Sequence, residues 1–159
     1  MEATLTYDEL IALRPCPSSL SRITQLLGGA KEWNGKPITA EQARNAGVTF
    51  AEIIWVTSTI ARKNPDVKRK LRLWLADCAA HVLFIFEKKI KNDNRPRLAI
   101  FAARDFALGK ITRAARDAAW DAARAAAGDA ARAAETSWQF HRLVLWLKDK
   151  EPEQYPLDQ

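Results

Sequence analysis

Apolar positions recur along this chain with a helical period, and capping signals mark where the helices begin. Three capping boxes start at Thr6, Thr39 and Thr49, where the threonine and a Glu or Gln three residues later can exchange hydrogen bonds with the backbone. Two further helices are expected to begin near Pro65 and Pro96, because proline is tolerated in the first helical turn. No stretch alternates polar and apolar residues between hairpin turns, so the sequence predicts an all-α fold.

These signals predict a compact single-domain bundle of six or seven helices. The helices are expected over residues 6–14, 18–27, 39–46, 49–63, 65–91, 95–108 and 112–150. Ser18 or Ser19 is expected to cap the second helix, and turn residues predict a loop over residues 30–37. Pro152 and Pro156 are expected to end the ordered structure. The domain is therefore assigned to residues 1–150, followed by a C-terminal tail of residues 151–159.

The helix over residues 65–91 is expected to be the central one, because apolar residues occupy more than one of its faces. The face predicted to form the core carries Leu71, Leu75, Cys78, Val82, Ile85 and Phe86. Asp77 and His81 lie one turn apart on the strip beside it, so a contact between them is geometrically easy. We interpret this pair as a structural hydrogen bond at the edge of the core, and an acid–base or metal site is the alternative.

More than half of residues 112–134 are alanine, which predicts a long Ala-rich C-terminal helix. Alanine pairs recur every four residues and form a stripe on which another helix can pack closely. Opposite charges such as Arg113 and Asp117, four residues apart, support the same helix. The stripe is interpreted as an internal packing face, with an interface to a partner or a second copy as the alternative.

The composition of the chain argues against a membrane protein and against a secreted protein. The 159 residues carry a net charge of +6, and the basic residues are spread along the chain, with one dense run from Lys68 to Arg72. No apolar run approaches the ~20 residues of a membrane span, and the N-terminus lacks the pattern of a secretory signal, so cytoplasmic residence is expected. Cys16 and Cys78 are expected to be reduced thiols. No cofactor or metal site is predicted.

Between Leu71 and the alanine block the chain carries a recognisable order of motifs. They are Trp74 with Asp77-Cys78-Ala79 and His81, then Arg95-Pro96-Arg97 with Ala99-Ile100, and then Gly109. In this order the chain resembles the Imm5-like group of immunity proteins, over residues 65–150. It is also similar to small helical proteins of phages and prophages, which resemble the N-terminal helical part of residues 1–64 as well.

The resemblance implies an all-helical, non-enzymatic protein of the bacterial host cytoplasm that neutralises a toxin or a host defence protein by occlusion. Five polar residues match the motif positions of the group, and Trp120 is added as an aromatic anchor for a partner. The expected partner-binding residues are Asp77, His81, Arg95, Arg97, Arg104 and Trp120. A homodimer is a further option, and a membrane partner is not expected. The alternative is a basic phage protein that binds nucleic acid through residues 68–72.

Overall fold

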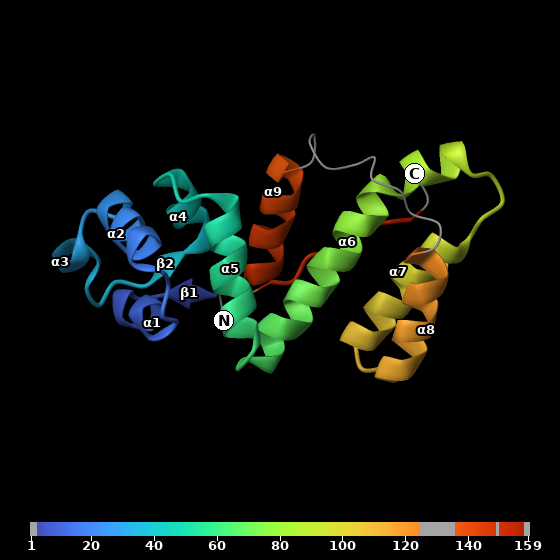
Figure 1. Ribbon diagram of the computed structural model, residues 1–159, viewed down its shortest axis with the longest axis horizontal. Helices are drawn as coiled ribbons and strands as arrows, with labels where there is room; N and C mark the ends of the chain where they lie inside the picture. The colour runs from blue at the N-terminus through green and yellow to red at the C-terminus, as the bar shows by residue number, and fades with distance from the viewer. Residues whose placement is uncertain (1–2, 125–135, 149, 158–159) are drawn as a thin grey trace. The chain divides into compact units, whose positions relative to one another are not determined.

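The computed structural model describes residues 3–124, 136–148 and 150–157, and it describes the backbone alone at Lys89 and at residues 120–124, 136 and 137. The described residues form nine helices and one small sheet (Figure 1). The helices are α1 (Tyr7–Ala12), α2 (Pro17–Leu26), α3 (Ala30–Trp33), α4 (Ala40–Asn45), α5 (Phe50–Ala61), α6 (Pro65–Lys89), α7 (Arg95–Ala107), α8 (Arg113–Arg124) and α9 (Thr136–Leu147). The predicted all-α fold is confirmed.

The predicted helix starts are mostly correct. At Thr6, Thr39 and Thr49 both hydrogen bonds of a capping box are present. The Asn64 side chain accepts hydrogen bonds from the backbone N–H groups of Asp66 and Val67 at 3.0 and 3.1 Å, which caps α6. The second helix is an exception: α2 begins at Pro17 after Cys16 with no side-chain cap, so the predicted serine cap is wrong. A proline in the first turn has no N–H group there that needs an acceptor.

A short helix and a two-stranded sheet were not predicted. Residues 30–33 form the helix α3 in place of a loop, and this helix buries Trp33 to 2 % exposure. The strands β1 (Thr4–Leu5) and β2 (Ile38–Thr39) pair in antiparallel register, with Thr4 opposite Thr39 and Leu5 opposite Ile38. A strand of two residues is too short for polar and apolar positions to alternate visibly, so the sequence pattern carries no signal for it.

The long C-terminal helix is described as two helices, α8 and α9. The later alanine pairs of the predicted stripe lie outside the described residues. The predicted ion pair from Arg113 to Asp117 is present, with Nε and Oδ2 3.7 Å apart. Gly109, with φ of +74°, ends α7 in the left-handed conformation expected of a glycine after a helix.

Contacts within the chain group into two compact units, residues 1–68 with 147–151 and residues 69–146 with 152–159. In the first unit, the helices α1 to α5 surround a core that includes Leu10, Ile23, Trp33 and Ile53. The backbone N–H of Ala3 donates to the carbonyl of Leu147 at 2.9 Å, which joins the end of α9 to this unit. The assignment of one domain to residues 1–150 stays a prediction.

In the second unit, α6 packs against α7, and α7 against α8 (Figure 1). Ala76, Ala80, Leu83 and Ile100 form a buried cluster between α6 and α7, and residues of the tail pack against this cluster. The prediction that Pro152 and Pro156 end the ordered structure is therefore wrong. Each proline removes one backbone donor, but an extended tail can still be held by the donors and acceptors of the residues between them.

The face of α6 predicted to form the core is not the buried face. Leu75 is 54 % exposed, and none of the other five residues of that face is fully buried. The buried face carries Leu73, Trp74, Asp77 and Ala80 instead. The physical reason is a carboxylate: the partners of Asp77 come from several segments, and their approach turns that side of α6 inward.

Replacing Thr49 by alanine should lower the free energy of unfolding by about 1 kcal/mol, because the Thr49 hydroxyl oxygen caps the N–H of Glu52 at the start of α5. Urea denaturation followed by circular dichroism measures the loss. The matched control is Thr59→Ala in the same helix, whose hydroxyl donates to the Trp55 carbonyl within the helix, and a change within about 0.5 kcal/mol is expected. Equal losses in the two variants would contradict the capping role.

Candidate functional site

Asp77 is fully buried within the second unit, with 0 % exposure. Its Oδ1 accepts hydrogen bonds from Arg104 Nη2 and from the backbone N–H of Tyr155, both at 3.0 Å. Its Oδ2 accepts from Arg142 Nε and from the Trp146 indole N–H, both at 2.8 Å. A buried carboxylate needs such donors because each lone pair left without one costs free energy. The four donors come from α7, α9 and the tail, so this one side chain joins three segments to α6.

The two arginines at Asp77 also hold the tail. Arg104 and Arg142 have side chains that are 7 % and 13 % exposed. Arg104 donates to the carbonyl of Tyr155, and Arg142 donates to the carbonyl of Glu153. Two guanidinium groups thus share one carboxylate, and each also donates a hydrogen bond to a backbone carbonyl of the tail. This arrangement pairs the buried charges and fixes the path of residues 153–155.

An aromatic cluster covers the next turn of α6. The rings of His81 and Trp138 stack, with centroids 3.9 Å apart and planes 4° apart, and Tyr155 meets both rings edge-on. His81 Nδ1 and the Tyr155 hydroxyl oxygen are 3.0 Å apart and share a hydrogen bond. Asp77 and His81 are therefore linked through Tyr155, and the direct contact suggested by their spacing is not among the four hydrogen bonds of Asp77. This is the geometry of a packed structural cluster.

Arg95 and Arg97 lie apart from this cluster, near the connection between α6 and α7. The Arg95 guanidinium hydrogen-bonds to Asp93, which lowers the pKa of Asp93 to about 2 and raises the pKa of Arg95. Arg97 forms a two-pronged pair with Glu87, Nε to Oε1 at 3.0 Å and Nη2 to Oε2 at 3.1 Å. The Arg95 side chain is 50 % exposed and that of Arg97 27 %, so both present surface to a partner.

The six residues proposed for partner binding thus do not form one surface. Asp77, His81 and Arg104 come together around Tyr155, but Asp77 and Arg104 are buried and offer a partner almost no area. The backbone of Trp120 belongs to α8, and its side chain lies outside the described residues. Partner binding by these six residues stays a hypothesis.

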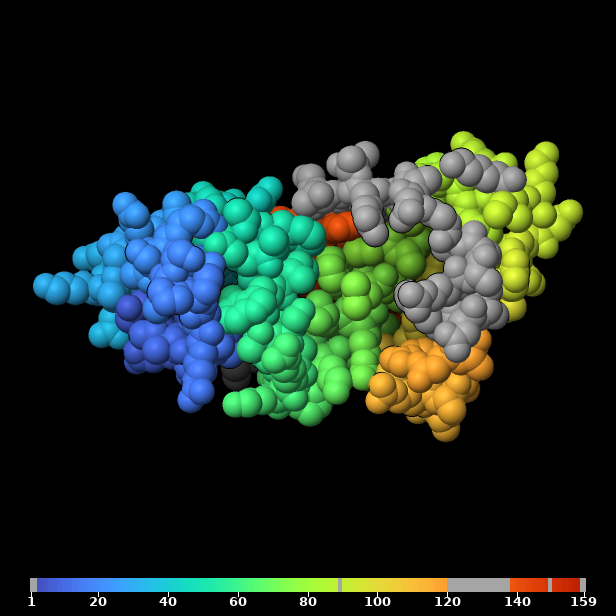
Figure 2. Space-filling model, viewed as in Figure 1, coloured from blue at the N-terminus to red at the C-terminus, as the bar shows by residue number. Residues whose placement is uncertain are grey.

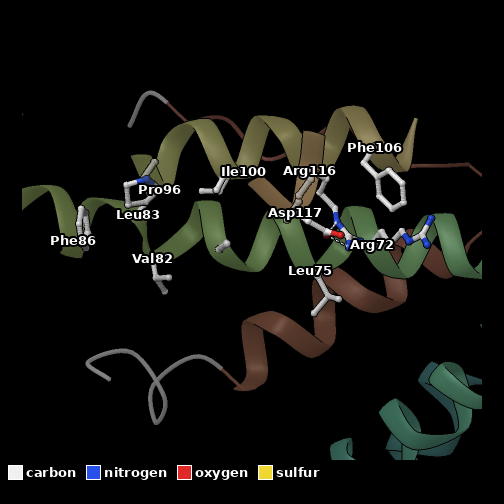
Figure 3. A pocket seen from close by; sticks show the side chains of 14 residues that line it. Arg72, Leu75, Val82, Leu83, Phe86, Pro96, Ile100, Phe106, Arg116 and Asp117 are labelled. Atoms are coloured by element: carbon white, nitrogen blue, oxygen red, sulfur yellow. Dashed lines mark hydrogen bonds and ion pairs between the residues drawn. The ribbon is translucent and has the colours of Figure 1, made fainter. Parts of the chain in front are cut away.

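A hollow lies between α6, α7 and α8. It has a volume of about 590 Å³, within the range of ligand-binding clefts, and it opens to solvent along the exposed stripe of α6. Figure 2 shows a gap between the green surface of α6 and the orange surface of α8. We call the hollow the α6–α7 groove. Its large apolar walls are Leu75, Val82, Phe86, Pro96, Ile100 and Phe106 (Figure 3).

Charged groups gather at one end of the α6–α7 groove (Figure 3). The guanidinium groups of Arg72 and Arg116 lie 4.4 and 4.5 Å from the centroid of the Phe106 ring. Arg116 and Arg113 both pair with Asp117. Burial lowers the pKa of Arg72, and the nearby positive charges of Arg116 and Arg113 lower it further. Among the described side chains, Arg113 and Arg116 share the carboxylate of Asp117, and Arg72 is close enough to both arginines to be affected by their charge.

Four residues that complete the buried cluster were missing from the sequence prediction: Trp138, Arg142, Trp146 and Tyr155. One signal could have found Arg142, because a carboxylate on a core helix requires buried cations or N–H donors from other helices. Nothing local marks Tyr155, since its N–H and carbonyl act through the backbone. No three His, Cys, Asp or Glu residues in the described part of the chain are close enough to hold a metal ion.

No helix in the described part of the chain is long and apolar enough to cross a membrane. Cys16 and Cys78 are not joined in a disulfide. The exposed Cys16 thiol hydrogen-bonds to the hydroxyls of Ser18 and Ser19, which lowers its pKa to about 7.

Asp77→Asn should lower the free energy of unfolding by about 3 to 5 kcal/mol, because it leaves two buried guanidinium groups without their carboxylate. Chemical denaturation of the purified variant measures this loss. Asp105→Asn is the control: Asp105 pairs with Lys110 at the surface, and a change within about 0.5 kcal/mol is expected. A loss for Asp77→Asn no larger than that of the control would rule out a structural role of the buried pair.

Ending the chain after Glu151 should destabilise the second unit by about 2 kcal/mol or more, since Asp77 loses one donor and Arg104 and Arg142 lose carbonyl acceptors. Tyr155→Phe keeps these backbone contacts and removes only the hydroxyl bonded to His81, so a loss of about 1 kcal/mol is expected. Thermal unfolding compares the two. Equal stability of the shortened and full chains would show that the tail does not hold the unit.

Comparison with known proteins places this architecture in a family. The family model described as "Imm-5 like putative immunity protein" matches residues 62–143, just over half of the chain. The match includes α6, α7, α8 and most of α9, and therefore Asp77, both arginines that bind it, and the whole α6–α7 groove. No curated protein and no solved structure matches the chain. The chain belongs to the Imm5-like family of immunity proteins.

Proposed function

We propose that this protein binds and neutralises one protein partner, a toxin or a defence component of the bacterial cell, by covering the surface through which that partner acts. The role is non-enzymatic, the gene belongs to a phage or prophage, and the protein works in the cytoplasm of the bacterial host. Membership of an immunity-protein family supports partner binding in general. The identity of the partner and the neutralising mechanism are the parts that we propose.

One observation carries the proposal: the most apolar stripe of α6 lines an open groove instead of the core. Leu75, at 54 % exposure, belongs to that stripe, and Leu75 and Val82 project from the same side of α6 in Figure 3. Val82 and Phe86 line the groove as well. Exposed apolar patches of this kind in folded proteins mark interaction sites. The α6–α7 groove lies entirely within the residues matched by the family model, where a binding surface common to the family would be expected.

The distribution of basic side chains argues against the nucleic-acid alternative. In the run of residues 68–72, Lys70 is buried at 4 % exposure, and Arg72 lies over the Phe106 ring. The run therefore does not present the continuous positive surface that phosphate backbones require. Protein binding through an apolar groove remains the better supported function.

The proposal is tested by immobilising the full chain in nuclease-treated bacterial lysate and washing at low and at high salt. We expect a protein that is retained at high salt, because apolar contacts resist salt whereas phosphate contacts weaken steeply. Expressed alone, that protein should arrest bacterial growth, and co-expression of this chain should restore it. The control bait is Lys68→Gln, which removes one exposed positive charge and should retain the same protein.

Failure to retain any protein would contradict the proposal, and so would either of two further results. In the first, a lysate without nuclease treatment yields only nucleic acid, which is lost at high salt and is captured less by Lys68→Gln; this result would favour the alternative. In the second, retained proteins form complexes with the chain but have no effect on growth alone. Binding would then serve a purpose other than neutralisation.

A further inference from the structure

The helix α6 has two apolar faces, of which one is buried and the other lines the α6–α7 groove. One face is buried against α7, α9 and the tail, with Leu73 and Trp74 at 1 % and 5 % exposure. The other face runs along Leu75, Val82 and Phe86 and forms a wall of the α6–α7 groove. A helix that only had to fold would need one apolar stripe. The second stripe is therefore available for an occupant.

The shape of the α6–α7 groove favours an elongated occupant. Leu75 and Phe86 are eleven residues apart on α6, and Pro96 and Phe106 ten residues apart on α7, so each apolar row runs for about 15 Å along its helix at 1.5 Å per residue. Small side chains lie between the large ones, including Ala79 and Ala103. Small residues let another backbone approach closely, which suits a third helix of about three turns.

The charge at one end of the α6–α7 groove favours an acidic group on the occupant. Arg113 and Arg116 pair with Asp117, and Arg72 lies near both arginines, so the described side chains at this end carry three positive charges and one negative charge. Among the described residues Arg72 has the Phe106 ring as a neighbour and no carboxylate partner. An added carboxylate would find a partly desolvated guanidinium there, where charged hydrogen bonds are strong.

We propose that the α6–α7 groove takes an amphipathic helical segment of the partner protein, with apolar residues along one face and an Asp or Glu that pairs with Arg72 at the end of the groove. This inference rests on the proposed function, since it names the part of the partner that binds. The apolar face fills the space along Leu75, Val82 and Phe86. The acidic residue fixes the direction in which the segment lies.

The test is a selection of random 16-residue peptides, displayed on phage, against the immobilised full chain. The peptides that survive should carry apolar residues at helical spacing and an acidic residue near one end. Their affinity is then measured with synthetic, fluorescently labelled peptides in solution. Ala79→Arg places a long charged side chain at an exposed position of the groove and should weaken binding about tenfold or more.

Two further variants separate charge from packing. Arg72→Gln should weaken binding about fivefold, and Arg72→Lys, which keeps the charge, should restore most of it. The control for Ala79→Arg is Phe101→Arg on α7, which adds the same charge at a 47 % exposed position outside the groove and should change affinity less than about twofold. Circular dichroism checks that each variant keeps its helical content.

The inference is overturned if no peptide is enriched, if the selected peptides bind Ala79→Arg as well as the unmodified chain, or if Arg72→Gln leaves their affinity unchanged. It is also overturned if dodecanoate binds in the groove while no peptide does, because the occupant would then be a small amphiphile. A partner protein from lysate that is retained equally by Ala79→Arg would overturn this inference alone. Failure to retain any protein would overturn the proposed function itself.

Discussion

The carboxylate of Asp77 sets the arrangement of the second unit. It is fully buried, so its hydrogen bonds have to come from other parts of the chain. Its four donors come from α7, from α9 and from the tail. The apolar packing around Ala80 and Ile100 stabilises the folded unit. It does little to select one orientation of α6, since apolar contacts are not directional. Hydrogen bonds to a buried charge are directional, so they select one orientation of α6 among those that bury similar apolar area.

The helices were largely predictable from the sequence because their starts depend on local chemistry. The boxes at Thr6, Thr39 and Thr49 each involve residues three apart, and the sequence shows both members. The orientation of α6 was not predictable in the same way. Its strongest apolar stripe includes Leu75, and ordinary periodicity places that stripe in the core. The actual choice depends on Arg142 and Tyr155, which are far away in sequence and carry no local signal.

The candidate site shows the same division between local and distant information. The motif residues Asp77, His81 and Arg104 meet in space, as their shared occurrence in one family pattern suggests, yet their meeting point is a residue of the tail, Tyr155. The α6–α7 groove was not foreseen, because an exposed apolar stripe and a buried one look alike in sequence. Hydropathy alone would place the polar residues Asp77 and Arg104 at the surface and the apolar stripe of α6 in the core. The structure buries these polar residues and leaves the apolar stripe along an open groove.

The distance of Asp77 from its partners along the chain bears on how this protein reaches its folded state. The donors lie 27, 65, 69 and 78 residues beyond Asp77 in sequence, so no short segment can satisfy the carboxylate by itself. While any of these segments is detached, the inner face of α6 keeps a charge that must stay in water, and burial of that face is opposed. Contacts this far apart slow folding and couple its steps. The second unit should therefore form late and cooperatively, with few partly assembled states.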